Sequence, residues 1–438
     1  MKFFNAKNFP FYYGWFLLPF ASIGVIMSIP GQTAGFSAFT DPLITISGIT
    51  RTALSTAYLF GTLSSGFILP FVGRFVDTIG SRKMMIFASI SLGITLLLLS
   101  QVEKTVQGIH LLFSFIPIKM IFFTAFIAGI FCLRFFGQGM LPIISNTMVG
   151  KWFDTYRGRA VAAMGIINSL AFNSAPTIMN ALVSAKGWKN AWLILSAITG
   201  VGMSSIAFLI YRKNPESCGL HVDGLEPVKN SQKYIEEEIT GMSVKDARKT
   251  IVFWLISIGL TIYSAIITGF TFHIEAIGNQ LGMPTAKALA IFIPVSFIAI
   301  PVSFIGSWVS NKLPVYFYLL CVSLGELTGF ISIFHLNATV GYTGAIIGLG
   351  FTGGLLGPIL STIVPKLFGR KHLGAINSAI ASMMVVGSAI GPVYLSLFND
   401  FNKSFVFGIL ISATLPLIIL IMSYRMRKKL EAVTILMN

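Results

Sequence analysis

Residues 73–83 read Gly-Arg-Phe-Val-Asp-Thr-Ile-Gly-Ser-Arg-Lys and lie between two apolar runs, each long enough to cross a membrane. Two spans joined by so short a link form a tight antiparallel pair. Gly73 and Gly80 allow the chain to turn and let neighbouring backbones approach closely. Asp77 can accept hydrogen bonds from the N-terminus of a neighbouring helix or pair with a cation. The basic residues at the end of the link are expected to hold it on the cytoplasmic side.

The composition indicates an integral membrane protein. Of the 438 residues, 55% are hydrophobic and 11% are charged, whereas soluble domains carry about 25% charged residues. A spanning helix needs about 20 apolar residues, because lipid offers no hydrogen-bond partners to the backbone. The sequence predicts an all-α protein with twelve spans, at about 12–35, 53–73, 84–101, 119–148, 160–183, 190–211, 251–275, 285–309, 314–335, 338–365, 374–398 and 403–424. The apolar segment 108–118 is expected to form an interfacial turn or an extension of the fourth span.

The net charge of +16 is distributed unevenly along the chain. With both termini in the cytoplasm, 23 of the 31 Lys and Arg residues fall on the cytoplasmic side, seven on the other side and Arg134 within a span. This asymmetry follows the positive-inside rule. We therefore expect anionic lipid headgroups, and not nucleic acid, to be the partners of this charge.

The chain is expected to form two six-helix halves, 1–211 and 251–438. The segment 212–250 has seven basic and seven acidic residues and is predicted to be a cytoplasmic linker. A partial repeat of the first motif begins at Gly306, 233 residues after Gly73, where Ser310 replaces the aspartate. Two related halves that meet at a midplane site are a common plan of transporters.

Other classes of function find little support. The first span is too long for the apolar core of a signal peptide. The three cysteines have neither metal-ligand spacing nor an even count. Walker loops, Gly-x-Ser-x-Gly elbows and paired metal-ligand motifs are missing from the sequence. We expect no cofactor, no metal and no enzymatic activity.

The motif at 73–83 resembles the signature loop between helices 2 and 3 of the major facilitator superfamily of transporters, with every defining position filled. Residues 133–139, Leu-Arg-Phe-Phe-Gly-Gln-Gly, resemble the helix 4 motif of that superfamily. Trp152-Phe153, followed by Arg-Gly-Arg-Ala at 157–160, is similar to its loop between helices 4 and 5. The resemblance covers nearly the whole chain and implies twelve helices in two halves, with transport by alternating access.

Two further loops resemble a subset of the superfamily, the bacterial monocarboxylate-porter-like and oxalate/formate-antiporter-like members. These loops are 214–220, Asn-Pro-Glu-Ser-Cys-Gly-Leu, with Asp-Gly at 223–224, and 368–374, Phe-Gly-Arg-Lys-His-Leu-Gly. One departure is that carboxylate porters of this kind usually carry a cation in helix 8 or 11. The corresponding spans, from Ala290 to Trp308 and from Ala375 to Phe398, have none, which argues against oxalate or a simple dicarboxylate.

Arg134 is the first candidate for function. An arginine at the centre of a span costs about 2.5–3.5 kcal/mol on insertion scales, so it should face protein or water. Gln138 and Ser145 follow at i+4 and i+11 and should share its helix face. Arg134 is expected to bind a substrate anion or couple a proton. The alternative is an arginine that braces the bundle through backbone carbonyls.

Two titratable residues in the second half are further candidates. Glu326 lies in mid-span, where burial favours the protonated acid, so it could load and release a proton. Alternatively, it is a protonated acid bonded to a neighbour on a peripheral helix. His273 ends the seventh span, and histidine titrates near neutral pH. The resemblance implies a histidine at this position in the carboxylate-porter-like subset, whereas an interfacial helix end, shared with Glu275, needs no function.

Polar stripes in two other spans supply the remaining candidates. Asn173 belongs to a stripe in the fifth span, which can line a cavity or pack against a helix. Gln32 is the polar group of a small-residue stripe in the first span, and it could face a cavity.

Together these features predict a monomeric secondary active transporter of the cytoplasmic membrane. It would move a small organic solute, such as a carboxylate or another organic anion, with protons or a counter-solute. Its cytoplasmic gate would comprise Gly73, Asp77, Gly80, Arg82 and Lys83. One alternative is proton-coupled transport of a larger metabolite or siderophore. Another is a polytopic sensor or scaffold that does not transport.

Overall fold

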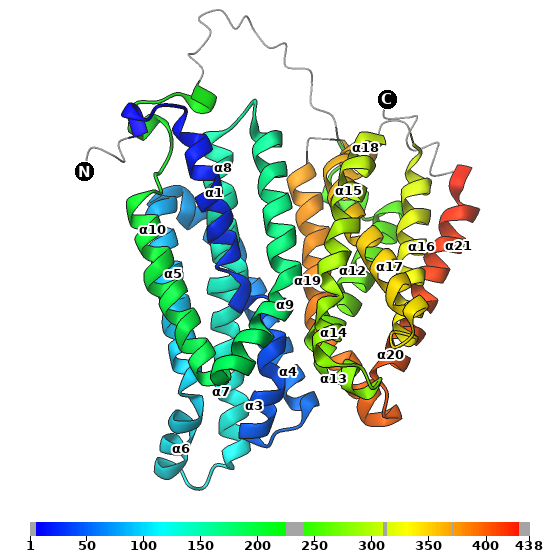
Figure 1. Ribbon diagram of the computed structural model, residues 1–438. Helices are drawn as coiled ribbons and strands as arrows, with labels where there is room; N and C mark the ends of the chain where they lie inside the picture. The colour runs from blue at the N-terminus through cyan, green and yellow to red at the C-terminus, as the bar shows by residue number, and fades with distance from the viewer. Residues whose placement is uncertain (1–5, 225–240, 310–312, 370–371, 429–438) are drawn as a thin grey trace, which may run out of the picture. The chain divides into compact units, whose positions relative to one another are not determined.

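The computed structural model describes residues 6–224, 241–309, 313–369 and 372–428. At eight of these positions it describes the backbone alone: Asn8, Pro70, Phe71, Gly73, Arg74, Asp77, Leu373 and Gly374. Every regular element in the described residues is a helix (Figure 1). The one β contact among them is an isolated antiparallel bridge between Gly241 and Gly369. The predicted all-α class is confirmed.

The chain divides into two compact units, 1–230 and 231–438. The first unit contains, in chain order, η2 (Ala6–Asn8), α1 (Tyr13–Ile26), η3 (Ile29–Gly31), α2 (Thr33–Phe36), η4 (Ser37–Phe39), α3 (Thr40–Ser47), α4 (Arg51–Ile79), α5 (Ser81–Ser100), α6 (Val102–Leu112), α7 (Ile118–Cys132), η5 (Leu133–Met140), α8 (Leu141–Trp152), α9 (Arg157–Ser196), η6 (Ala197–Met203), α10 (Ser204–Leu209), η7 (Glu216–Cys218) and η8 (Val222–Gly224). The elements η5 and η6 are π-helical, and the other η elements of this unit are 3₁₀ helices.

The second unit contains α11 (Val244–Ala247), α12 (Ile251–Phe272), α13 (Ile274–Gln280), α14 (Thr285–Ala290), α15 (Phe292–Val309), α16 (Val315–Phe334), α17 (Thr339–Pro358), η9 (Ile359–Ile363), α18 (Val364–Phe368), α19 (Leu373–Asn402), α20 (Phe405–Ser412) and α21 (Thr414–Arg425). The element η9 is π-helical and connects α17 to α18 without a break in the helical chain. Of the linker predicted at 212–250, residues 225–240 lie outside the described part of the chain.

Eleven helical segments in the described residues are long and apolar enough to cross a membrane. The longest, Arg157–Leu209, has 53 residues, which corresponds to about 80 Å of helix against a hydrocarbon core of about 30 Å. It bends at Gly187, whose φ of 75° is non-helical. This one segment therefore provides two spans, as the sequence predicts at 160–183 and 190–211.

The link between the second and third spans is shorter than expected. Helix α4 continues through most of the motif to Ile79, and α5 begins at Ser81. The whole turn is Gly80, with φ 96° and ψ 150°. This backbone conformation is one that residues with a Cβ rarely adopt, so glycine lets two helices meet with one residue between them.

Two other boundaries also differ from expectation. The first span extends from Tyr13 to Gly31, but its α-helix α1 ends at Ile26 and is followed by the 3₁₀ helix η3, which contains Pro30 and Gly31. The segment 108–118 is neither an extension of the fourth span nor a turn throughout. Its first residues end α6, and 113–117 connect α6 to α7. Figure 1 shows α6 at the end of the first unit opposite α10.

Close helix packing in the second unit depends on glycine. Helix α17 packs against α16 at Gly348, where an added Cβ would collide with the backbone of Gly329. It packs against α15 at Gly354, where an added Cβ would lie 2.6 Å from the carbonyl oxygen of Ala299. Because membrane helices associate through such small residues, the glycines of the tenth span serve packing, and α17 is enclosed by α15 and α16.

A carboxylate outside the spans joins two loops of the first unit. Asp223, in η8, is 7% exposed. Its oxygens accept hydrogen bonds from the backbone N–H groups of Asp154 at 3.1 Å, Thr155 at 2.7 Å and Tyr156 at 3.3 Å. These groups precede α9, so Asp223 satisfies donors that have no partner inside the helix. Asp223 has a φ of 59°, so its backbone is in the left-handed region.

Candidate functional site

Arg134 lies in the interior of the first unit. It belongs to the π-helix η5 and is 2% exposed. Its Nη1 donates hydrogen bonds to the carbonyl oxygen of Gly31 at 3.3 Å and to Oγ1 of Thr33 at 3.4 Å. The guanidinium carbon lies 4.9 Å from the ring centroid of Tyr58 on α4. The Tyr58 hydroxyl is 2.5 Å from Oγ1 of Thr33, so the same hydroxyls connect three segments around the cation.

The guanidinium of Arg134 is incompletely bonded. Its Nε is buried without a hydrogen-bond partner among the described residues. The ion pairs found in those residues involve four other cations, and none of them reaches Arg134. A buried charge is costly unless it is paired and hydrogen-bonded. This arginine therefore has the capacity to take an anionic partner.

A pair of glycines places Arg134 beside the broken first span. A Cβ added at Gly31 would lie 2.8 Å from Cα of Gly137, so η3 and η5 are in backbone contact. The π-helical bonding of η5 changes the residue spacing per turn, and the expectation that Gln138 shares the helix face of Arg134 stays a prediction. Pi-helical turns occur frequently at functional sites.

The other polar candidates of the first unit lie in different surroundings. Gln32 follows Gly31 in the chain, is half-buried and donates to Oγ of Ser28 at 3.2 Å. Gln138 is half-buried on η5, on the segment that contacts Gly31. Asn173 bonds its own helix, donating to the carbonyl oxygen of Ser169 at 2.9 Å. The structure thus brings Gln32 and Gln138 onto segments beside Arg134.

Sequence reasoning missed the immediate partners of Arg134. Thr33 and Tyr58 have no motif, and they lie 101 and 76 residues away from Arg134 in the chain. The one available signal was the Pro30-Gly31 pair, because proline and glycine interrupt helices. A break there frees the Gly31 carbonyl to accept a side-chain hydrogen bond.

Glu326 lies in the interior of the second unit on α16 and is 1% exposed. Neither carboxyl oxygen has a hydrogen-bond partner among the described residues. Tyr263 of α12 lies within electrostatic range of the carboxyl group. The Tyr263 hydroxyl donates to the carbonyl oxygen of Leu349 on α17 at 3.1 Å. Glu326 therefore lies near the packing of α12, α16 and α17. The alternative interpretation required a hydrogen bond to a neighbour, and the described residues provide none.

His273 joins several helices of the second unit. It is fully buried between α12 and α13. Its Nε2 lies 2.9 Å from the carbonyl oxygen of Pro392 and 3.1 Å from Oγ of Ser396, both on α19. Its ring stacks on Phe405 of α20 with centroids 4.9 Å apart. These contacts suit a residue that fixes helix positions.

The gate candidates are described in part. Arg82 lies over the ring of Phe208, with its guanidinium carbon 4.7 Å from the ring centroid. Lys83 is exposed at the start of α5. The side chain of Asp77 lies outside the described part of the structure, and of Gly73 the backbone alone is described, so the roles of both residues stay predictions. No group of three or more potential metal ligands occurs within the described residues.

Comparisons with known proteins agree with this architecture. The sequence profile of the Major Facilitator Superfamily matches residues 8–392. None of the curated proteins compared with the chain matches it significantly. Similar solved structures include a bacterial homologue of the human lysosomal transporter Spinster in two inward-facing states. The unoccupied state has 11% identity, covers 97% of this chain and 98% of its own, and gives a TM-score of 0.69. The occupied state also has 11% identity, covers 97% of this chain and 96% of its own, and gives a TM-score of 0.63.

At 11% identity the structural likeness shows the fold alone, which is the twelve-span fold that the sequence predicts. The narrower resemblance to the monocarboxylate-porter-like subset stays a prediction. The family match extends over most of the chain and confirms the superfamily, the membrane setting and the absence of an enzymatic role. The chain belongs to the Major Facilitator Superfamily and is a multi-pass membrane transporter.

Proposed function

We propose that this transporter moves a small organic anion, such as a monocarboxylate, across the cytoplasmic membrane by alternating access. The observation that carries the proposal is the buried guanidinium of Arg134, which has no carboxylate partner among the described residues. The loop motifs at 214–220 and 368–374, which resemble those of carboxylate porters, support the same class.

The chemistry of Arg134 favours a carboxylate over a neutral solute. A guanidinium presents N–H donors in a planar fork that matches a carboxylate through two parallel hydrogen bonds. Nε is one arm of that fork and is left unpaired by the described residues. The spans at 290–308 and 375–398 add no second cation. One cation suits a substrate with one anionic group, so we expect monoanions to be preferred over dicarboxylates.

Uptake into proteoliposomes would test this substrate class. We expect transport of one or more small carboxylates and no transport of the corresponding amides, which have nearly the same shape without the charge. Arg134→Lys should weaken apparent affinity and leave some transport, because lysine keeps the charge but loses the fork. Arg134→Ala should abolish transport. The control is Arg157→Ala, whose side chain is exposed and pairs with Asp154.

The yield of folded protein separates binding from bracing. If Arg134 only braces the bundle, both substitutions should lower the detergent-stable yield, and residual uptake should scale with that yield. Normal yield together with normal uptake in Arg134→Ala would exclude both roles and direct attention to Glu326 and His273.

We further propose that Glu326 is the proton-coupling residue. A bare carboxylate is costly in a dry interior, and both oxygens of Glu326 lack partners among the described residues. Such an acid can hold a proton while it is enclosed and release it when water reaches it. The hydroxyl of Tyr263 on α12, which lies within electrostatic range of Glu326, donates to the carbonyl oxygen of Leu349. His273 is bonded to Pro392 and Ser396, which makes it a weaker candidate for this role.

Glu326→Gln should separate coupling from binding. The amide has the same shape but cannot carry the proton, so accumulation driven by a pH gradient should be lost while exchange of labelled for unlabelled substrate persists. The control is Glu103→Gln, which alters a half-buried residue paired with Lys189 outside the interior of either unit. Unchanged pH-driven accumulation in Glu326→Gln would assign coupling to another group or to a counter-solute.

The stretch from Gly73 to Lys83 is proposed to be the cytoplasmic gate. The Asp77 carboxylate is expected to make charge-assisted bonds in only one of the two access states. Asp77→Asn should therefore slow initial uptake with little loss of folded protein, whereas Asp246→Asn, at an exposed position in the short helix α11, should leave uptake unchanged. Unchanged uptake rates in Asp77→Asn would contradict a gating role and leave the stretch with a role in membrane topology alone.

A further inference from the structure

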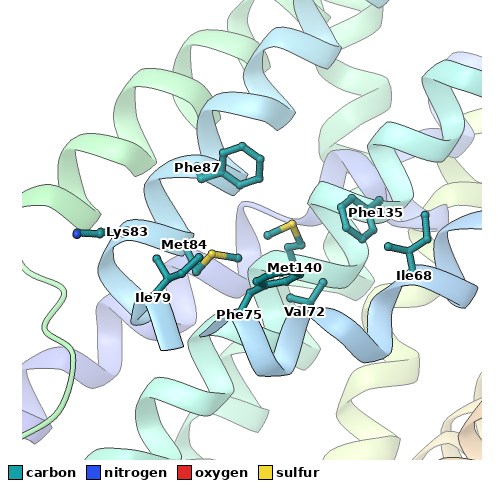
Figure 2. Close-up of a pocket in the computed structure, with 9 residues that line it drawn as sticks. All are labelled: Ile68, Val72, Phe75, Ile79, Lys83, Met84, Phe87, Phe135 and Met140. Carbon is teal, nitrogen blue, oxygen red and sulfur yellow. The ribbon is translucent and has the colours of Figure 1, made fainter. Parts of the chain in front are cut away.

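An apolar groove of about 460 Å³ lies on the first unit, and Arg134 is not among its lining residues (Figure 2). Four residues of α4, three of α5 and two of η5 line it. Figure 2 shows Phe75, Phe87, Phe135 and Met140 around this space. Its volume falls within the range of about 300–1,000 Å³ typical of pockets that hold small ligands.

The groove opens outward through exposed apolar side chains. Phe75 is 53% exposed and Phe87 is 54% exposed. In a soluble protein such a surface would be unfavourable, but α4 and α5 are membrane-spanning helices. Hydrocarbon chains, rather than water, are the solvent of such a surface.

Among the side chains that the structure describes, one charged group, the ammonium of Lys83, lines the groove. It is exposed in the first turn of α5, and no ion pair in the described residues includes it. Two further cations lie close by. Arg82 precedes it in the chain, and the side chain of Lys213 lies 3.3 Å from the position of a Cβ on Gly80. Three cations, Lys83, Arg82 and Lys213, therefore lie at or near the turn between α4 and α5.

We propose that the groove binds an acyl chain of an anionic glycerophospholipid whose phosphate contacts Lys83. The apolar lining matches the hydrocarbon, and the ammonium group matches the phosphate, to which lysine binds as a point charge. The partner is drawn from the membrane leaflet nearest the α4–α5 turn. The groove adjoins the gate stretch and η5, and the inference stands independently of the transported substrate.

Photolabelling would test the lipid site. The purified full-length protein is placed in nanodiscs with phosphatidylglycerol or phosphatidylcholine that carries a photoreactive group in the acyl chain, and the adducts are mapped by mass spectrometry. We expect adducts from phosphatidylglycerol within 68–87 and 135–140, at several times the level obtained with phosphatidylcholine. Lys83→Gln should reduce phosphatidylglycerol labelling about fivefold, the typical effect of one lysine near an anionic membrane surface. Lys428→Gln, at the exposed last residue that the structure describes, beyond the end of α21, is the control and should leave labelling unchanged.

A second variant tests the apolar part of the site separately. Ile79 lines the groove and is 45% exposed, so Ile79→Trp should fill the groove without disturbing a buried core. This variant should lose labelling by both lipids, whereas Lys83→Gln should lose only the preference for phosphatidylglycerol. Equal labelling by the two lipids in the wild-type protein, or adducts spread evenly over exposed apolar positions, would overturn the proposal. If neither lipid labels the groove and native mass spectrometry detects a dimer, the proposal is wrong and a second copy of the chain covers the groove.

Discussion

At the scale of single residues, three buried polar side chains differ in how well they are bonded. His273 has acceptors at Pro392 and Ser396. Arg134 has long hydrogen bonds from one nitrogen, and Glu326 has none among the described residues. Because an unbonded buried polar group is costly, its presence calls for a role other than stability. Arg134 and Glu326 therefore support function better than His273 does.

We predict that His273 contributes mainly to stability. His273→Leu removes the donor to the Pro392 carbonyl and should destabilise the fold by about 1–3 kcal/mol. A thermal unfolding assay in detergent would measure the loss. His221→Leu, at an exposed position, is the control. Wild-type stability in His273→Leu combined with an altered pH dependence of transport would contradict this prediction and restore a proton role.

At the scale of elements, the site depends on close contact between two irregular segments, η3 and η5. Gly31 and Gly137 allow this contact, because any side chain at Gly31 would meet the backbone of η5. The contact brings the Gly31 carbonyl and Thr33 within hydrogen-bond distance of Arg134. The geometry of the arginine is therefore set by two glycines that carry no chemistry of their own.

Gly31→Ala should disturb this contact. The added methyl group would lie 2.8 Å from Cα of Gly137, and such overpacking typically costs about 1–3 kcal/mol. Gly165→Ala is a matched control in α9, because no atom lies within 4 Å of the added methyl group. It should be neutral or stabilise the helix by up to about 1 kcal/mol. Equal stability of the two variants, measured by thermal unfolding, would show that η3 and η5 can move apart to accommodate the methyl group at little cost in free energy.

The loop before α9 should depend on Asp223. Asp223→Ala leaves the N–H groups of Asp154, Thr155 and Tyr156 without their acceptor and should cost about 1–3 kcal/mol. Hydrogen exchange at these three amides should accelerate. Asp223→Asn should rescue part of the loss, because asparagine tolerates the left-handed backbone and keeps one acceptor oxygen. Unchanged hydrogen exchange at these amides in Asp223→Ala would show that the carboxylate does not stabilise this loop.

At the scale of the whole molecule, charge placement predicts orientation. Of the 31 basic residues, 23 belong to segments that would be cytoplasmic if both termini were cytoplasmic, which is the arrangement favoured by the positive-inside rule. The signature stretch at 73–83, with its cations, should lie on the same side. The orientation of the chain thus follows from its loops and not from its spans.

We predict that both termini and 212–250 are cytoplasmic. A reporter that fluoresces only in the cytoplasm should be bright when fused after Asn438. The same reporter fused after Lys104, in a truncated chain that ends beyond the third span, should be dark. A dark but well-expressed fusion at Asn438 would reverse the topology, and with it the side on which the gate is proposed to act.

Much of this protein is determined by local sequence. Hydropathy fixes the spans because each must bond its own backbone in lipid, and the motif at 73–83 identifies the superfamily. Arg134 and Glu326 stand out because charge within a span is costly wherever the helix packs. Tertiary structure alone decides what surrounds them. The partners of Arg134 lie more than 70 residues away in the chain, the π-helix η5 alters the spacing per turn, and the groove beside Lys83 combines residues of three elements. Hydropathy and spacing describe one helix at a time, whereas hydrogen bonds between helices depend on how close their backbones approach.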